Sequence, residues 1–336
     1  MTNRTILSSA IVAAVSLASC SRQAKAPATV TPLAATATQP VKATAEAFIS
    51  GATMLSAPVA EAKMYKLLPG YNSSDNFEAS GVYYIGGYFY IACDNMQKIA
   101  KIKSTLPINS SQNSLLSTGA PGSGSSNYEG IAYDNNGTPN FFVVEESVNN
   151  GSYYQPRISE LNSSMSYQNR MWVDYYFTSS TSNKAFEGIA WVYRGGNDYM
   201  LGLVEGTGKV PVFVKTGSNW SYVTEITLPS SVTFTDYSDI AIYGNQIAIT
   251  SQVDGQLWIG TLSSTAWSIT GGTAYTLPLG SSGGVIGAGS YQLYGNIEGV
   301  SFISSTQVVI VSDKADSGQP SYQSYKDQSV AIFNIP

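Results

Sequence analysis

The sequence predicts an all-β fold, a β-propeller, for residues 63–336, and three observations support this. Aromatic and β-branched residues are interleaved with Gly, Asn and Ser, which is typical of short strands joined by tight turns. Only 12% of the 336 residues are charged, whereas 23 are tyrosine and 31 are glycine. A short segment also recurs five times at intervals of about 50 to 60 residues, the size of one four-stranded propeller blade.

Residues 1–19 have the features of a bacterial lipoprotein signal peptide. Arg4 precedes an apolar run at residues 6–17, which is too short to span a bilayer as a stable helix. The run ends in Leu17-Ala18-Ser19-Cys20, which resembles a lipobox. We therefore expect Cys20 to be lipidated and to anchor the protein to a membrane. Ser21 rather than Asp follows the cysteine, which favours the bacterial outer membrane, with the protein facing the periplasm or the cell surface.

Residues 20–62 are expected to form the acylated cysteine and a flexible tether. This segment is rich in Ala, Thr and Pro and contains no aromatic residue before Phe48. Such a composition buries too little apolar surface to offset the entropy of ordering the chain. If Cys20 is acylated, Cys93 has no disulfide partner, and its strand-like surroundings at residues 88–93 predict a small buried hydrophobic residue.

The composition excludes several classes of function. The sequence contains no histidine, which removes Ser-His-Asp and Cys-His catalysis and every zinc site that needs imidazole. Its net charge of −5, without a basic stripe to neutralise phosphates, argues against nucleic acid as a partner. Any catalysis would have to rely on carboxylates, Tyr, Lys or a hard metal ion.

The recurring segment marks the start of each expected blade. Each of the first four copies leads into a short apolar strand, a turn rich in Gly or Asn and a stronger second strand; the fifth copy turns at Ser304-Ser305 instead. Third and fourth strands follow in several units, and fourth strands at residues 225–228 and 274–277 end in Leu-Pro. The five copies are Ala79-Ser80-Gly81-Val82, Tyr128-Glu129-Gly130-Ile131, Phe186-Glu187-Gly188-Ile189, Tyr237-Ser238-Asp239-Ile240 and Ile297-Glu298-Gly299-Val300.

The ends of the array predict how the propeller closes. The last copy runs out after its third strand, at residues 329–335, whereas residues 64–68 precede Pro69 with the fourth-strand pattern. We expect this N-terminal strand to complete the last blade, which would leave no free sheet edge. The count is then five four-stranded blades. A sixth would be present if residues 280–294 held additional strands.

Carboxylates recur at two positions of the repeat. In a propeller, the loop that leads into the innermost strand and the loop after the second strand open on the same face. We therefore expect a ring of acids at one mouth of the central channel. Glu129, Glu187 and Glu298 lie at the first position, and Asp94, Glu145 with Glu146, Glu205 and Asp313 lie at the second.

Two interpretations of this ring stand side by side. Like charges held close together cannot all remain ionised without a partner, and Ca²⁺ binds six to eight oxygen ligands from carboxylates, carbonyls and water. The ring would then be a Ca²⁺ site or an acidic funnel for a cationic ligand. Alternatively, Glu-Gly is structural: the Glu caps backbone amides and the Gly permits a tight approach of the strand.

The repeat start and the acids after it resemble two related propeller families, the SdiA-regulated proteins and the esterase-like phytases. The resemblance covers roughly residues 64–336 and depends on Glu129-Gly130-Ile131-Ala132, Glu187-Gly188-Ile189-Ala190 and Asn296-Ile297-Glu298-Gly299-Val300. Phytase-like members imply Ca²⁺-assisted hydrolysis of phosphomonoesters. SdiA-regulated members imply a calcium-containing propeller in the periplasm or at the cell surface.

Three functions follow as hypotheses. The first is a lipid-anchored binding protein that engages a small molecule, a glycan or a protein through its acidic, Ca²⁺-binding face. The second is a Ca²⁺-dependent hydrolase of phosphoesters or lactones, in which Glu129, Glu187 or Glu298 would hold the metal. The third is a structural subunit of an envelope or extracellular assembly, packed through Tyr- and Ser-rich strands.

Overall fold

The computed structural model describes residues 52–122, 125–136, 140–178 and 185–336, and nearly all of them lie in strands, turns or loops. These residues belong to one compact unit, Thr44–Pro336. The predicted signal peptide and Cys20 lie outside the described residues. No helix in the described part of the chain has the length and apolar character needed to cross a membrane.

The prediction of an all-β fold is confirmed: consecutive strands pair antiparallel in meanders of three or four. The first meander contains β3 (Ala79–Ile85), β4 (Tyr88–Cys93), β5 (Lys98–Lys103) and β6 (Ser114–Ser117). The second contains β7 (Tyr128–Asp134), β8 (Asn140–Asn149), β9 (Tyr154–Asn162) and β10 (Tyr167–Val173). The third contains β11 (Phe186–Arg194), β12 (Asn197–Val204), β13 (Val210–Thr216) and β14 (Asn219–Ile226).

Two further meanders follow. The fourth contains β15 (Asp239–Tyr243), β16 (Gln246–Ser251), β17 (Gln256–Leu262) and β18 (Ile269–Thr276). The last contains β21 (Ile297–Ser304), β22 (Gln307–Ser312) and β23 (Ser329–Asn334). A parallel pairing of β10 with β14 joins the second and third meanders into one sheet. Between the last two meanders, β19 (Leu279–Gly280) and β20 (Tyr291–Gln292) form a two-stranded sheet within the region that could have hidden a sixth blade.

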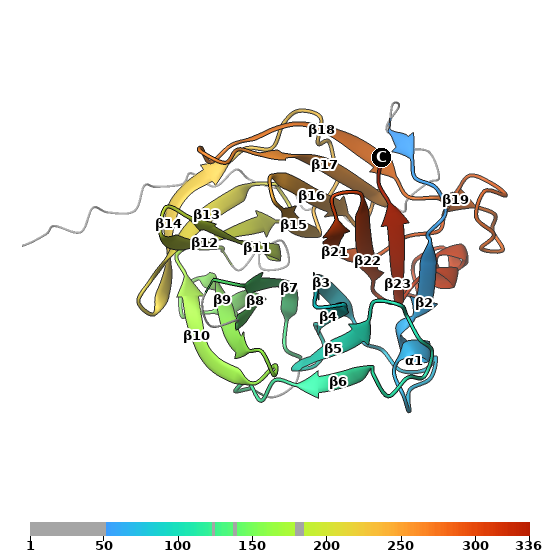
Figure 1. Cartoon of the computed structure of the whole chain (residues 1–336), viewed down its shortest axis with the longest axis horizontal. Coiled ribbons are helices and arrows are strands. Elements are labelled where there is room, and N and C mark those ends of the chain that lie inside the picture. Colours follow the sequence, from blue (N-terminus) through green and yellow to red (C-terminus); the bar gives the residue numbers. More distant parts are fainter. Residues whose placement is uncertain (1–51, 123–124, 137–139, 179–184) are drawn as a thin grey trace, which may run out of the picture. The chain divides into compact units, whose positions relative to one another are not determined.

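The first strands of the five meanders lie side by side. β3 contacts β7 and β21, β11 contacts β7 and β15, and β15 contacts β21. Figure 1 shows these strands at the centre, with the later strands of each meander further out. This is the arrangement of a β-propeller, and it places the five copies of the repeated segment next to one another.

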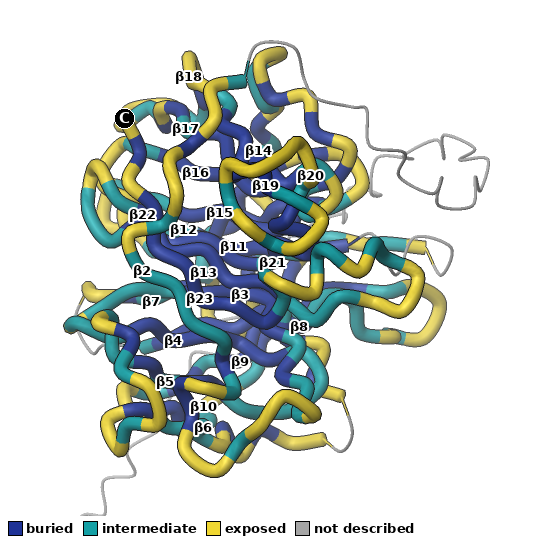
Figure 2. Tube along the Cα trace, turned by 90° about the vertical axis from the view of Figure 1, so that its right-hand side faces the viewer, coloured by how far each residue is buried: buried dark blue, intermediate teal, exposed yellow. Residues whose placement is uncertain are grey.

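The hydrophobic core lies between consecutive meanders. Ile91 of β4 packs in one cluster with Val311 of β22, and Leu201 of β12 packs in another with Ile247 of β16. The inner strands carry mostly apolar residues because both of their faces are covered. In Figure 2 these strands are dark blue, whereas exposed residues gather at loops and outer edges.

The N-terminal strand differs from the prediction. Residues 64–67 form a single helical turn, α1 (Met64–Leu67), and not a strand. The preceding segment, β2 (Ala60–Lys63), pairs antiparallel with β23, and β1 (Thr53–Met54) pairs parallel with β18. Met64 and Leu67 are fully buried, which explains why their apolar pattern resembles a strand. Residues 53–54 and 60–62, expected in the tether, are therefore part of the sheets.

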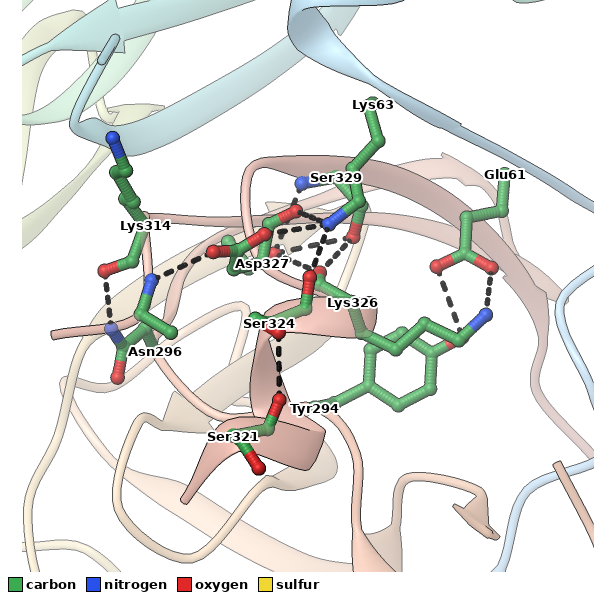
Figure 3. Close-up of polar contacts among 12 residues, drawn as sticks. Glu61, Lys63, Tyr294, Asn296, Lys314, Ser321, Ser324, Lys326, Asp327 and Ser329 are labelled. Atoms are coloured by element: carbon green, nitrogen blue, oxygen red, sulfur yellow. Dashed lines mark hydrogen bonds and ion pairs between the residues drawn. The ribbon is translucent and has the colours of Figure 1, made fainter. Parts of the chain in front are cut away.

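Ion pairs hold β2 in place beside the segment that leads into β23 (Figure 3). Lys63 Nζ lies 2.6 Å from Asp327 Oδ1 and donates to the carbonyl of Ser324, 3.0 Å away, at the 3₁₀ helix η2 (Ser321–Tyr325). Lys326 Nζ lies 2.5 Å from Glu61 Oε2. The charges on β2 thus alternate in sign and match those of residues 326 and 327.

Candidate functional site

The three repeat glutamates begin the inner strands at irregular positions. Register shifts occur at Glu129 in β7, at Glu187 in β11 and at Glu298 in β21. A β-bulge leaves a residue unpaired and redirects its side chain. Each glutamate is half-buried, at the end of the inner strand where the second strand of its meander terminates.

The glycine after each glutamate is required by the neighbouring inner strand. A Cβ at Gly130 would lie 2.5 Å from the Ile189 nitrogen, and one at Gly188 would lie 2.7 Å from the Ile240 nitrogen. Real Cβ atoms do not approach backbone so closely, so the inner strands pack at this distance only because these positions lack side chains. The structural interpretation of Glu-Gly therefore holds for the glycine.

In the fourth copy Asp239 replaces the glycine and acts as a backbone cap. Its carboxylate accepts hydrogen bonds from the Ile240 and Val300 nitrogens, both at 2.8 Å. Burial raises the pKa of Asp239 well above its usual range. Asp239 was not among the predicted site residues. The sequence did carry a signal for it, because the other four copies of the repeat have Gly at this position.

The carboxylates around these inner strands influence one another. The pKa of each repeat glutamate is raised well above its usual range, first by loss of hydration and then by neighbouring negative charges. Burial also raises the pKa of Asp94. The carboxylates linked in this way, called the acidic cluster below, are Asp94, Glu129, Glu146, Glu187, Glu205, Asp236, Glu298 and Asp313.

Asp313 is the member of the acidic cluster whose pKa is raised to about neutrality. Loss of hydration raises its pKa to about 7, and the charges of Glu78 and Asp94 add to the shift, although a backbone hydrogen bond from Lys314 opposes it. Its Oδ1 atom is buried without a hydrogen-bond partner. A buried polar atom without a partner is costly, so this oxygen favours either a proton or a bound cation.

Glu145 does not belong to the acidic cluster, and its assignment to the ring is corrected here. Its Oε2 lies 2.5 Å from Arg157 Nη2, and its Oε1 lies 2.8 Å from Arg170 Nε. The next residue, Glu146, acts electrostatically on Glu129 and Glu187 instead. Adjacent strand residues point to opposite sides, so the sequence Glu-Glu did not indicate which of the two faces the channel.

The other predicted acids belong to the acidic cluster, and Asp236, which was not predicted, belongs to it as well. Asp94, Glu205 and Asp313 directly follow β4, β12 and β22 and act on one or more of the repeat glutamates. Asp236 is buried, accepts from Ser251 Oγ at 2.5 Å, and acts on Glu298. It lies only three residues before Asp239, but no repeat position marked it.

The acidic cluster is not a preassembled metal cage. Within the described residues, no group of three acidic or cysteine side chains is arranged to hold a metal ion. The carboxylates line neighbouring strands without converging on one point. They can attract a cation electrostatically, and a Ca²⁺ ion held by fewer than three of them would take its other ligands from carbonyl groups and water. Cys93, fully buried with its pKa raised to about 12 by burial, behaves as the predicted apolar residue.

Comparisons with known proteins place the chain in no family. No protein-family model matches it, and neither does any curated protein. Solved structures show distant similarity to β-propeller proteins. Glutaminyl cyclase from Myxococcus xanthus has a TM-score of 0.42 and 8% identity, covering 85% of this chain and 100% of its own.

Two others are comparably distant. The PQQ-bound aldose sugar dehydrogenase from Streptomyces coelicolor has a TM-score of 0.41 and 10% identity, covering 83% of this chain and 100% of its own. GH43B of the Bacteroides ovatus xyloglucan locus has a TM-score of 0.45 and 11% identity, covering 82% of this chain and 54% of its own.

Proposed function

We propose that this chain is an exported, lipid-anchored binding protein whose acidic cluster takes up a cationic ligand. The fold in this proposal is a five-bladed propeller, with β2 as the outer strand of the last blade. The lipobox-like segment at Cys20 supports the anchor, and the pairing of β2 with β23 supports the closure.

One observation carries the binding proposal: carboxylates on neighbouring inner strands raise one another's pKa. Structural ion pairs have the opposite effect, because a cation beside a carboxylate lowers its pKa. The repulsion among Glu129, Glu187 and Glu298 at the strand ends therefore stores electrostatic energy that a bound cation would release. Asp313 Oδ1, buried without a partner, supplies an oxygen for such a ligand.

The geometry limits the kind of cation. Since no three carboxylates converge, the candidates are Ca²⁺ that keeps several waters between itself and the acids, or an organic ammonium or guanidinium group on a larger ligand. Extracellular Ca²⁺ sites commonly bind at roughly 10⁻⁴–10⁻³ M. An organic cation would instead form hydrogen bonds with the carboxylates directly.

Thermal unfolding and calorimetry test the proposal. The mature chain carrying Cys20→Ser would be titrated in chelator-treated buffer with CaCl₂, MgCl₂ or spermidine, against NaCl at matched ionic strength. A ligand at a hundred times its Kd should add about 2.7 kcal/mol, or roughly 5–10 °C in Tm.

Matched variants locate the effect. The double variant Glu187→Gln/Glu298→Gln should lose the ligand-dependent shift, while Asp174→Asn, an exposed acid outside the acidic cluster, should keep it. No shift with any of the three cations would overturn the binding proposal. A shift that survives in the double variant would place the site elsewhere.

Hydrolysis is a second candidate because of Asp313. A carboxyl group with a pKa near 7 can serve as a general acid or base at neutral pH. Phosphomonoester, carboxylester and lactone substrates, screened with and without Ca²⁺, would test this. Turnover abolished by Asp313→Asn but retained in Asp174→Asn would support the enzyme, and the absence of turnover would leave the binding function.

A further inference from the structure

A second polar site lies beside the acidic cluster and has the opposite charge. It is a hollow of about 290 Å³, and among the described residues that line it the charged ones are Glu145, Arg157 and Arg170. Two guanidinium groups and one carboxylate leave a surplus of one positive charge. The protein as a whole has a net charge of −5, so this hollow is a local region of opposite charge that favours an anion.

The bonding of Glu145 leaves arginine donors unused. Its Oε2 accepts both bonds from Arg157, through Nε at 3.2 Å and Nη2 at 2.5 Å. Its Oε1 lies 2.8 Å from Arg170 Nε in an ion pair and accepts a hydrogen bond from Ser159 Oγ at 3.0 Å. Arg170 Nε donates to Ser159 Oγ at 3.2 Å. Within the described residues, the two Nη atoms of Arg170 have no acceptor, although its side chain is only 14% exposed.

Aromatic side chains contact the two arginines of this hollow, and a bulge lies beside them. The guanidinium of Arg157 lies 5.3 Å from the ring centroid of Trp172, and that of Arg170 lies 5.8 Å from that of Tyr167. A cation–π contact of this kind attracts the guanidinium group to the face of the ring. Strand β8 bulges immediately after Glu145, where its pairing with β9 shifts register, and this opens the sheet beside the arginines.

The rest of the lining defines the chemistry of a ligand. The amides of Gln97, Asn127 and Asn149 line the hollow together with serines, and no aromatic residue does. Such a surface suits a hydrophilic molecule with several hydroxyl groups. Its volume lies at the small end of ligand pockets, and a surplus of one charge matches one negative charge on the ligand.

We propose that this hollow binds the carboxylate of a small polyhydroxylated acid, of the sugar-acid class, through the free edge of Arg170. The carboxylate would receive the Nη donors of Arg170, and the amides would bond the hydroxyl groups. The site is separate from the acidic cluster and does not depend on cation binding there.

Calorimetry and ligand-observed NMR with sodium glucuronate test this on the mature Cys20→Ser chain. D-Glucose tests the need for charge, and inorganic phosphate tests whether any oxyanion is accepted. Glucuronate should bind and glucose should bind at least tenfold more weakly. No binding of glucuronate would overturn the proposal, and phosphate binding as tightly as glucuronate would overturn the assignment of a carboxylate.

Two variants and a control complete the test. Arg170→Gln should weaken glucuronate binding at least tenfold. Asn149→Trp would block the hollow from an exposed position and leave the ion pairs intact, so it tests the site even if Arg170→Gln fails to fold. Arg194→Gln, an arginine that bonds the carbonyls of Ser263 and Ala266 instead, should bind normally. Unchanged binding in Asn149→Trp would refute the location.

Discussion

At the scale of single residues, Gly130 and Gly188 allow neighbouring inner strands to pack closely, because they have no side chain. Gly130 and Gly188 do not have left-handed backbone angles, so their role is not turn formation. Each lies where an added Cβ would meet the backbone of the next inner strand. Because five inner strands meet one another around the centre, a displacement at one position would be passed to both of its neighbours.

Substitution of one of these glycines should therefore destabilise the protein. Gly188→Ala is expected to lower the free energy of unfolding by about 1–3 kcal/mol, the usual cost of overpacking a well-packed interior. Gly318→Ala is the control, because that glycine has open space around it and no left-handed backbone angle. Chemical denaturation followed by circular dichroism would measure both, and equal stability of the two variants would contradict the packing argument.

The protonation of a single residue, Asp313, should make the stability of the fold depend on pH. Its pKa rises from 3.8 to about 7 on folding, so the folded state binds a proton more tightly than the unfolded state does. The resulting stabilisation is fully present below about pH 4 and is lost as the pH rises through about 7. Stability should thus fall between pH 4 and pH 7 in the presence of a chelator.

Asp313→Asn isolates this contribution. At pH 8 the variant should be more stable than the wild type by about 1–2 kcal/mol, allowing for solvent screening of a half-buried group. The gain should vanish near pH 4, where the wild-type carboxyl is protonated as well. Tm measured in steps from pH 4 to pH 8 would show this, whereas a constant difference across the range would argue against titration of Asp313.

At the scale of an element, β2 depends on its charges as much as on its backbone pairing. The side chains of Lys63 and Asp327 are only 16% and 14% exposed. Removing one partner of such a pair leaves the other charge poorly solvated. Lys63→Met should therefore cost about 1–3 kcal/mol and speed amide exchange at β2 and the facing residues of β23.

Lys209→Met provides the comparison for that experiment. Lys209 pairs with Glu225 at 2.9 Å, but its side chain is 52% exposed. Ion pairs at that exposure contribute little, so we expect a change below about 0.5 kcal/mol. Similar losses in both variants would mean that the charges around β2 have no special role in holding it.

Some of the strands could be placed from the sequence, and the N-terminal strand could not. The bounds of β4 were predicted as the structure has them, and β16 was predicted one residue short at its C-terminal end, because a Gly- or Asn-containing turn precedes each strand. The N-terminal strand was misplaced because Met64 and Leu67 are buried as a helical turn, and burial alone does not distinguish a turn from a strand.

The acidic cluster was predictable only in part, for a similar reason. A period-two pattern assigns side chains to faces, but a bulge shifts that assignment by one residue. Glu145 and Glu146 were predicted together at one repeat position, and only Glu146 acts on the repeat glutamates. The pairing of Glu145 with Arg157 and Arg170 depends on the register of β8 with β9 and of β9 with β10, which no local motif specifies.

At the scale of the whole molecule, two opposite charge environments lie next to each other. Glu145 and Glu146 are consecutive, yet the first lines the arginine hollow and the second acts on the acidic cluster. A bulge in one strand thus separates two candidate binding sites. A ligand that carries both a cationic group and a carboxylate would be complementary to the pair.

The proposed anchor at Cys20 would determine where such ligands are met, and it yields the last prediction. The wild-type chain should label with palmitate and fractionate with the membrane, since two acyl chains are enough for stable attachment. Cys20→Ser should be unlabelled and soluble. Cys93→Ser is the matched control, because Cys93 is fully buried inside the fold and its loss should leave labelling unchanged. A Cys20→Ser chain that remained labelled and membrane-bound would refute the anchor.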